Sequence, residues 1–328
     1  MPKPSAVDPK SLLKGYSLLR DTCGRVSLPD HAAVFLLGED RKGWLQGQAT
    51  QNLRPLGTGG STAFCFCEAT GQMVTIAEAW ELGDRIAFTV PRATLDATLA
   101  RIEQMTILED VVAEVADGHR VISIQGPQAS AELSKLFNLP QLDAGRVSFE
   151  GEDLLCLRSN RTGMGGWDLW IPTREAEMAI EAIFPEVAPE AYEVARIEAG
   201  IPKWGADATS KTLPPELGPV FLAQHVSHSK GCYVGQEVLQ RIHSRGHVNR
   251  VWVGLIADRP IPLGSRISHL RREDVGTVTS AGNSPDFGFL GAAIVRQEAA
   301  FDGESVRIHT EEESFDAEVR PMPVLRFA

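Results

Sequence analysis

The hydrophobic pattern of this 328-residue chain changes near residue 250. After that point, short apolar stretches follow one another about ten residues apart, separated by turn residues and without helical periodicity. They lie at residues 251–256, 266–269, 275–279, 291–295, 305–309 and 315–319. Strands of this length and spacing predict a small β-barrel or sandwich. We therefore expect two domains, at residues 1–250 and 251–328.

The first 250 residues combine strand patterns with helical ones. Strand patterns at residues 61–67 and 74–80 are joined by a turn, and a third covers residues 85–90. Leu95, Leu99 and Ile102 then recur at helical spacing. A looser version of the same order follows residue 140. The hairpin links and the polar–apolar alternation favour two related α+β lobes with antiparallel sheets over a parallel doubly wound sheet.

Composition excludes several classes of protein. The balance of 32 Lys+Arg against 43 Asp+Glu gives a net charge of −11, which disfavours direct nucleic-acid binding through net charge. No apolar run reaches about 18 residues, so we expect no membrane span. Residues 1–14 lack the apolar core of a signal peptide. Five cysteines are too few for a disulfide scaffold, and their odd number favours reduced thiols in a cytoplasmic setting.

One octapeptide is the densest chemical signal in the chain: Lys230-Gly231-Cys232-Tyr233-Val234-Gly235-Gln236-Glu237. Two glycines flank the cysteine and the tyrosine, so the backbone is expected to bend tightly on both sides of the thiol. A thiol beside a lysine and close to a helix start has its thiolate favoured, which raises its reactivity. The alternative interpretation is a buried cysteine in a turn.

Two further segments carry candidate binding residues. Glu198 precedes Gly-Ile-Pro and is suited to accept hydrogen bonds from a heterocycle with N–H donors, such as a pterin; an ordinary helix-ending glutamate is the alternative. A basic run follows the octapeptide and suits an anionic group, such as a folate tail or an RNA phosphate, or is a solvated turn. It comprises Arg241, His243, Arg245, His247 and Arg250. Gly246 interrupts the spacing of the two histidines, so we expect no metal site.

The octapeptide resembles the signature of the YgfZ family, folate-binding proteins of iron–sulfur cluster assembly and maintenance. That family is related to the T-protein of the glycine cleavage system, an aminomethyltransferase. The resemblance covers nearly the whole chain. Four other segments share it: Leu45-Gln46-Gly47-Gln48-Ala49-Thr50, Gln125-Gly126-Pro127, Arg196-Ile197-Glu198-Ala199-Gly200-Ile201-Pro202, and Gly276-Thr277-Val278-Thr279-Ser280 in the terminal strands.

The resemblance implies a three-lobed ring of two α+β lobes and a C-terminal β-barrel, with tetrahydrofolate or a derivative in a central channel. It implies that Glu198 meets the pterin, that Arg241 lies near the glutamate tail, and that function depends on Cys232. It further implies iron–sulfur assembly proteins or client enzymes as partners, and an indirect link to tRNA modification.

The chain departs from T-protein at the position of the catalytic acidic pair. Residues 71–78 read Gly-Gln-Met-Val-Thr-Ile-Ala-Glu, which places Thr75 and Ile76 where two aspartates are expected. Neither side chain can act as a carboxylate beside a folate. A folate-dependent accessory protein is therefore favoured. The alternatives are an aminomethyl or other one-carbon transferase, and a scaffold that binds no ligand. A second departure is Asn52, where YgfZ relatives commonly have aspartate.

Overall fold

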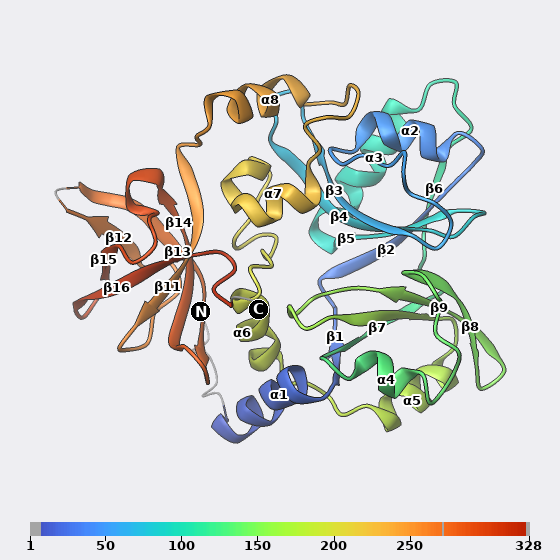
Figure 1. Cartoon of the computed structure of the whole chain (residues 1–328), viewed down its shortest axis with the longest axis horizontal. Helices are drawn as coiled ribbons and strands as arrows, with labels where there is room; N and C mark the ends of the chain where they lie inside the picture. The colour runs from blue at the N-terminus through green and yellow to red at the C-terminus, as the bar shows by residue number, and fades with distance from the viewer. Residues whose placement is uncertain (1–7, 271, 326–328) are drawn as a thin grey trace.

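The computed structural model describes residues 8–270 and 272–325. It confirms the predicted α+β architecture of two antiparallel sheets and a closed C-terminal barrel (Figure 1). The first sheet has the strand order β3-β4-β5-β2-β6. Its strands are β2 (His31–Leu37), β3 (Ser61–Cys67), β4 (Met73–Glu81), β5 (Ile86–Pro91) and β6 (Val112–Val115).

The second sheet has the order β1-β7-β10-β9-β8. Its strands are β1 (Gly24–Ser27), β7 (Arg120–Gln125), β8 (Ala144–Phe149), β9 (Glu152–Arg158) and β10 (Gly166–Ile171). The second lobe is discontinuous in the chain. Its strand β1 comes before all the strands of the first sheet, and its other strands come after them. This corrects the expectation that one lobe ends before the other begins near residue 140.

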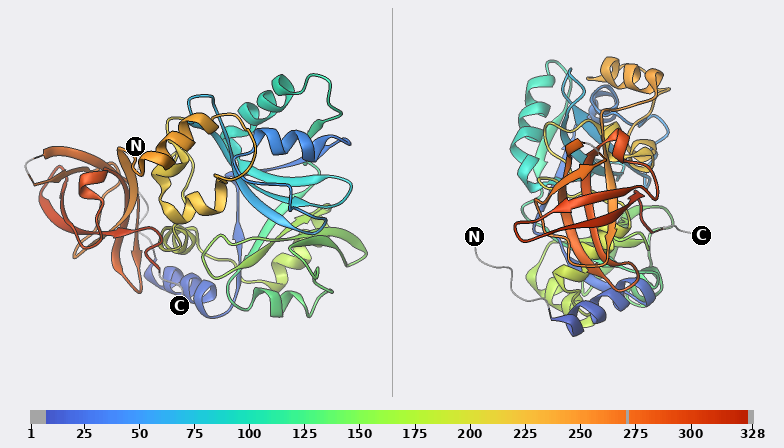
Figure 2. Two further views of the ribbon diagram at one scale, coloured as in Figure 1. Left: turned by 45° about the horizontal axis from the view of Figure 1, so that its top comes forward. Right: turned by 90° about the vertical axis from the view of Figure 1, so that its left-hand side faces the viewer.

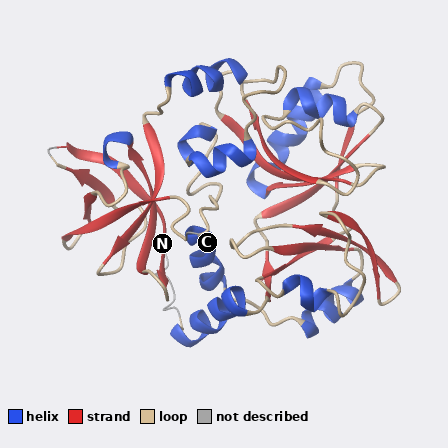
Figure 3. Cartoon of the chain, in the orientation of Figure 1, coloured by secondary structure: helices blue, strands red, loops and turns tan. Residues whose placement is uncertain are grey.

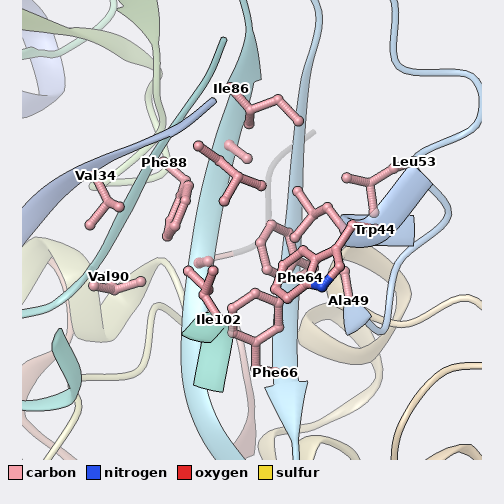
Figure 4. Close-up of a cluster of buried hydrophobic side chains, with 14 of the residues drawn as sticks. Val34, Trp44, Ala49, Leu53, Phe64, Phe66, Ile86, Phe88, Val90 and Ile102 are labelled. Atoms are coloured by element: carbon pink, nitrogen blue, oxygen red, sulfur yellow. The ribbon is translucent and has the colours of Figure 1, made fainter. Parts of the chain in front are cut away.

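Helices cover the outer faces of the two sheets (Figure 3). Apolar side chains of α2 (Arg41–Gln48) and α3 (Leu95–Met105) pack on the first sheet, and those of α4 (Ala129–Leu133) and α5 (Arg174–Ile183) on the second. Figure 4 shows the first of these cores, in which Trp44 and Ile102 meet Phe64 and Phe66. The inner faces pack together through residues that include Phe35, Trp80, Leu157 and Trp170. The two sheets therefore share a buried apolar interface.

The barrel closes in the order β11-β14-β13-β12-β15-β16. Its strands are β11 (Arg250–Ala257), β12 (Arg266–His269), β13 (Arg272–Ser284), β14 (Gly288–Arg296), β15 (Ser305–His309) and β16 (Ser314–Pro321). Each corresponds to one of the short apolar stretches of the sequence. In the second view of Figure 2 the barrel lies in front of the two sheets.

Four further helices connect the sheets to the barrel: α1 (Pro9–Asp21), α6 (Pro189–Glu198), α7 (Pro219–His225) and α8 (Gln236–Arg245). The sequence analysis did not predict α1. Leu12, Tyr16 and Leu19 recur at helical spacing and are buried against α6, and the Asp8 side chain accepts from the Lys10 N–H at 3.1 Å to cap α1.

A buried ion pair fixes α6 to the barrel. Arg196 on α6 donates to Asp207 at 2.5 Å, and Asp207 also accepts from Thr279 and Ser280 of β13 at 2.5 and 2.8 Å. Arg196 and Asp207 are 2% and 1% exposed. Because removing one partner leaves a buried charge uncompensated, this network determines where α6 sits.

We expect Asp207→Ala to lower the free energy of unfolding by about 3–5 kcal/mol, since Arg196 loses its most deeply buried partner. Urea unfolding of the whole chain measures this loss. The matched control is Asp258→Ala, which breaks the exposed pair with Arg259 and should leave stability unchanged. Equal stability of the two variants would show that the buried pair does not hold the barrel in place.

Candidate functional site

A cavity of about 1740 Å³ lies where the three lobes meet. Strands of the first sheet, the loop before β10, α6, α7 and the barrel strand β13 all contribute to its wall. Apolar side chains such as Val90, Val194 and Phe221 alternate with charged ones such as Glu78 and Arg161. A mostly apolar enclosure with a few polar groups is typical of a site for an organic ligand or cofactor.

Glu198 lies at the end of α6, and its carboxylate is fully buried. It accepts from the Tyr16 hydroxyl at 2.9 Å, from the Ser284 hydroxyl at 2.6 Å and from the Arg20 guanidinium. Its acceptor positions are thus occupied by donors from α1 and the barrel. Its chain neighbours Ala199 and Gly200 line the cavity, whereas Glu198 is not among the described lining residues.

The octapeptide forms the loop between α7 and the start of α8. Lys230 is buried, and its ammonium donates to the backbone carbonyls of Gln46, Ala49 and Gln51 at 2.6, 2.6 and 2.9 Å. The first two carbonyls belong to the family segment Leu45–Thr50, and the third follows it directly. Three acceptors match the three hydrogens of the ammonium group. The two motifs, far apart in sequence, therefore join in one contact.

Other motif residues hold the same loop. Tyr233 is buried in a core that includes Cys67. Gly235 has a φ of +89°, and a Cβ there would lie 2.7 Å from the Glu68 carbonyl oxygen, so only glycine fits. The Gln236 side chain donates to the Lys230 carbonyl at 3.5 Å. The loop is anchored on both sides of its cysteine.

Cys232 is exposed on this loop, unlike the other four cysteines of the chain. This rules out the interpretation as a buried cysteine. The sequence suggested that Lys230 stabilises the Cys232 thiolate. The Lys230 ammonium group instead donates to three backbone carbonyls. Burial raises the pKa of Cys23 to about 11 and of Cys67 to about 12, and likewise raises those of Cys65 and Cys156.

Arg241 and its basic neighbours lie on or after α8, outside the described wall of the cavity. The Arg241 guanidinium donates to Glu237 at 2.7 Å. His243 stacks on His228 with ring centroids 3.8 Å apart, and His247 contacts the Arg245 carbonyl oxygen at 3.2 Å. Within residues 8–270 and 272–325, no group of three metal-ligating side chains comes together.

The wall of β4 carries a carboxylate that the sequence interpretation passed over. Thr75 is buried against Thr94, with hydroxyl oxygens 2.6 Å apart, whereas Ile76 lines the cavity. Glu78 is two residues further along the strand, so alternation places it on the same side as Ile76. Burial raises the pKa of Glu78 to about 7. The two-residue spacing from Ile76 to Glu78 in a predicted strand could have identified Glu78 from the sequence.

Comparison with known proteins gives a family and a fold. A family model described as the GCVT N-terminal domain matches residues 15–226. The tRNA-modifying protein YgfZ of Yersinia enterocolitica is 27% identical over 307 residues, covering 91% of each chain. YgfZ of Yersinia pestis (strain Pestoides F) is 28% identical over 267 residues, covering 78% of this chain and 79% of its own.

The crystal structure of glycine cleavage system aminomethyltransferase T from Bartonella henselae superposes with a TM-score of 0.86 at 19% identity. It covers 97% of this chain and 90% of its own, and it shows a shared fold. The resemblance inferred from the motifs is confirmed by these matches. Across the described residues, no helix combines the length and apolar character needed to cross a bilayer.

The exposure difference predicts selective alkylation. In the native chain at pH 8, iodoacetamide should modify one thiol, Cys232, because burial shields the other four and keeps them protonated. Intact-mass measurement would count the added groups, and peptide mapping would locate them. The variant Cys232→Ala should add none until it is unfolded in urea. Rapid modification of a second thiol in the folded chain would contradict the placement.

Proposed function

Because this chain belongs to the family of the GCVT N-terminal domain, we propose that it binds tetrahydrofolate or a derivative in the cavity between its lobes. We further propose that it supports tRNA modification indirectly, through assembly or repair of iron–sulfur clusters. Its YgfZ relatives are named tRNA-modifying proteins, which supports the link to tRNA modification. We also propose a cytoplasmic location.

The anchored, exposed thiol of Cys232 is the observation that carries the proposal. The contacts of Lys230, Tyr233 and Gly235 hold the loop, while Cys232 itself is left open to solvent. A thiol presented in this way is available to a protein partner or to a cluster that is delivered as cargo. Iron–sulfur assembly proteins or client enzymes are the partners of this proposal.

The cavity has room for a reduced folate and a lining that suits it. Its volume of about 1740 Å³ is above the range of roughly 300–1,000 Å³ typical of small-molecule sites, so a folate would fill only part of it. Asn160, Arg161 and His31 supply polar atoms, and the ring of Phe221 and the side chain of Val90 supply apolar surface. When bound, the folate would supply a one-carbon carrier, and the side chains of the cavity would bind and orient it and exclude water.

Glu198 is our proposed pterin contact. Since its acceptor positions are occupied, a pterin N–H gains access by replacing the Tyr16 hydroxyl. Tyr16 keeps a second acceptor in Asp286, at 2.8 Å, to which its hydroxyl hydrogen can turn. We propose that Arg241, on exposed α8, attracts the anionic tail of the folate by charge. A direct role in binding nucleic acid is not part of the proposal.

Aminomethyl transfer is the second candidate function, supported by the shared fold of the aminomethyltransferase. Against it stand Thr75, whose hydroxyl faces Thr94, and Ile76, which presents only hydrocarbon to the cavity. Formation of methylene-tetrahydrofolate from an aminomethyl-loaded carrier protein tests this candidate. We expect no turnover above background, and sustained turnover would favour the transferase.

Calorimetry with tetrahydrofolate tests the binding half of the proposal. We expect binding by the whole chain, weakened in Glu198→Gln by about 1–3 kcal/mol because a charged acceptor is lost. The control is Glu186→Gln, which alters a largely exposed glutamate at the cavity wall and should bind like the native chain. If the native chain does not bind tetrahydrofolate, the hypothesis of a scaffold without a ligand is favoured. If both variants bind with equal affinity, Glu198 does not contact the ligand.

Complementation tests the thiol. In a strain that lacks its own YgfZ relative, we expect the native gene to restore the activity of an iron–sulfur enzyme and the Cys232→Ala gene to fail at equal protein level. The Cys23→Ala gene, which alters a buried cysteine, serves as the matched control and should restore activity. Full restoration by Cys232→Ala would contradict a role for the thiol.

A further inference from the structure

Glu78 is an acidic side chain in the cavity wall that the proposed function does not use. It lies on β4, opposite Ala63 of β3 and Thr89 of β5, and its side chain is 30% exposed. That exposed part belongs to the cavity wall. Among the described residues, its one charged contact is the Arg161 guanidinium, 3.5 Å from its carboxylate. This distance is too long for a strong hydrogen bond.

Arg161 is already neutralised by a different carboxylate. Asp168 is fully buried and accepts from Nε of Arg161 with both oxygens at 3.1 Å, and from Nη2 as well. Asp168 also accepts from the hydroxyls of Ser123 and Ser159 at 2.7 and 2.8 Å. The guanidinium charge is thus shared by two carboxylates, and Asp168 has the better geometry. Glu78 is left without a full counter-charge.

This imbalance makes Glu78 protonatable near neutral pH. Burial raises its pKa to about 7, Asp168 and Asp143 add to the rise, and Arg161 opposes it. Two histidines line the same cavity, and burial lowers the pKa of His31 to about 3 and of His225 to about 4. Both imidazoles therefore stay neutral in the range where Glu78 titrates.

His31 adds a hydrogen-bond donor to the same cluster. Its Nε2 is 3.5 Å from Nη1 of Arg161, which is itself a donor, so Nε2 is suited to be the acceptor and Nδ1 to carry the hydrogen. Nδ1 is buried and has no hydrogen-bond partner within the described chain. Arg161 thus contacts both the Glu78 carboxyl group and the His31 ring at this part of the cavity wall.

We propose that Glu78 and Arg161 form a proton-linked subsite of the cavity, which binds an amino group or N–H edge of the ligand. In the free protein at pH 7, about half of the Glu78 carboxyl groups hold a proton. When the ligand binds, the O–H bond breaks and the proton passes to solvent. The carboxylate that remains accepts a hydrogen bond from the ligand N–H, and Arg161 stabilises its charge. No electrons are exchanged and no co-reactant is needed.

The subsite rests on the proposed function, because its probe is tetrahydrofolate, which carries amino and N–H groups. Calorimetry of the whole chain at pH 7 in phosphate and in Tris, whose ionisation heats differ widely, counts the protons released. We expect the native chain to release about half a proton. We also expect its affinity to rise about tenfold from pH 6 to pH 8, as the ionised fraction of Glu78 rises.

Two variants test whether Glu78 is the group that releases the proton. Glu78→Gln should release no proton and bind with an affinity that does not change over this range of pH. Glu175→Gln, which alters an exposed glutamate on α5 away from the cavity wall, should behave like the native chain. If tetrahydrofolate binds the native chain and Glu78→Gln with the same proton release, the subsite is wrong and the proposed function stands.

A measurement without ligand separates the two failures. The side-chain carboxyl carbon of Glu78, assigned in a ¹³C NMR titration by its absence in Glu78→Gln, should titrate near pH 7. Titration in the ordinary range of glutamate would overturn the subsite whether or not folate binds. Titration near pH 7 together with no heat from tetrahydrofolate would support the subsite and overturn folate as its ligand.

Discussion

The contact on which the functional region depends is the ammonium group of Lys230 with three backbone carbonyls at the end of α2. It joins two motifs about 180 residues apart and fixes the loop that follows α7. The segment after α2 is also bonded to the end of α7 and to β3. Thr50 donates to the His225 carbonyl at 2.6 Å and accepts from the Cys65 N–H at 2.8 Å. The wall of the cavity and the position of Cys232 follow from these bonds.

Buried ion pairs then set how the lobes meet. Arg20 with Glu198 joins α1 to α6, and Arg196 with Asp207 joins α6 to the barrel. Arg161, held by Asp168 in the second lobe, faces Glu78 in the first. A buried charge without its partner is costly, so each pair disfavours other arrangements of the lobes. In an acidic chain, these few arginines are placed at the junctions where the cavity forms.

Local patterns were sufficient to predict most elements, and contacts between distant segments were not. The strand pattern in residues 61–67 and the helical spacing of Leu95, Leu99 and Ile102 report local geometry, and the strand and the helix both appear as predicted. The barrel followed from strand spacing. The partners of Lys230 are main-chain carbonyls, which cannot be recognised from residue types. The closeness of Lys230 to Cys232 in the sequence therefore suggested a role in stabilising the thiolate. The cluster of Glu78 and Arg161 unites two lobes, and only alternation from Ile76 pointed to its first member.

The proposed function depends on one cavity for a folate and on one anchored thiol at a separate position. A crystal structure of the whole chain with tetrahydrofolate tests this most directly. We predict ligand density in the cavity between α6, α7 and the two sheets, with the Lys230 contacts intact and Cys232 still exposed. Clear density for the ligand at another position, with the cavity holding only solvent at saturating ligand, would contradict it.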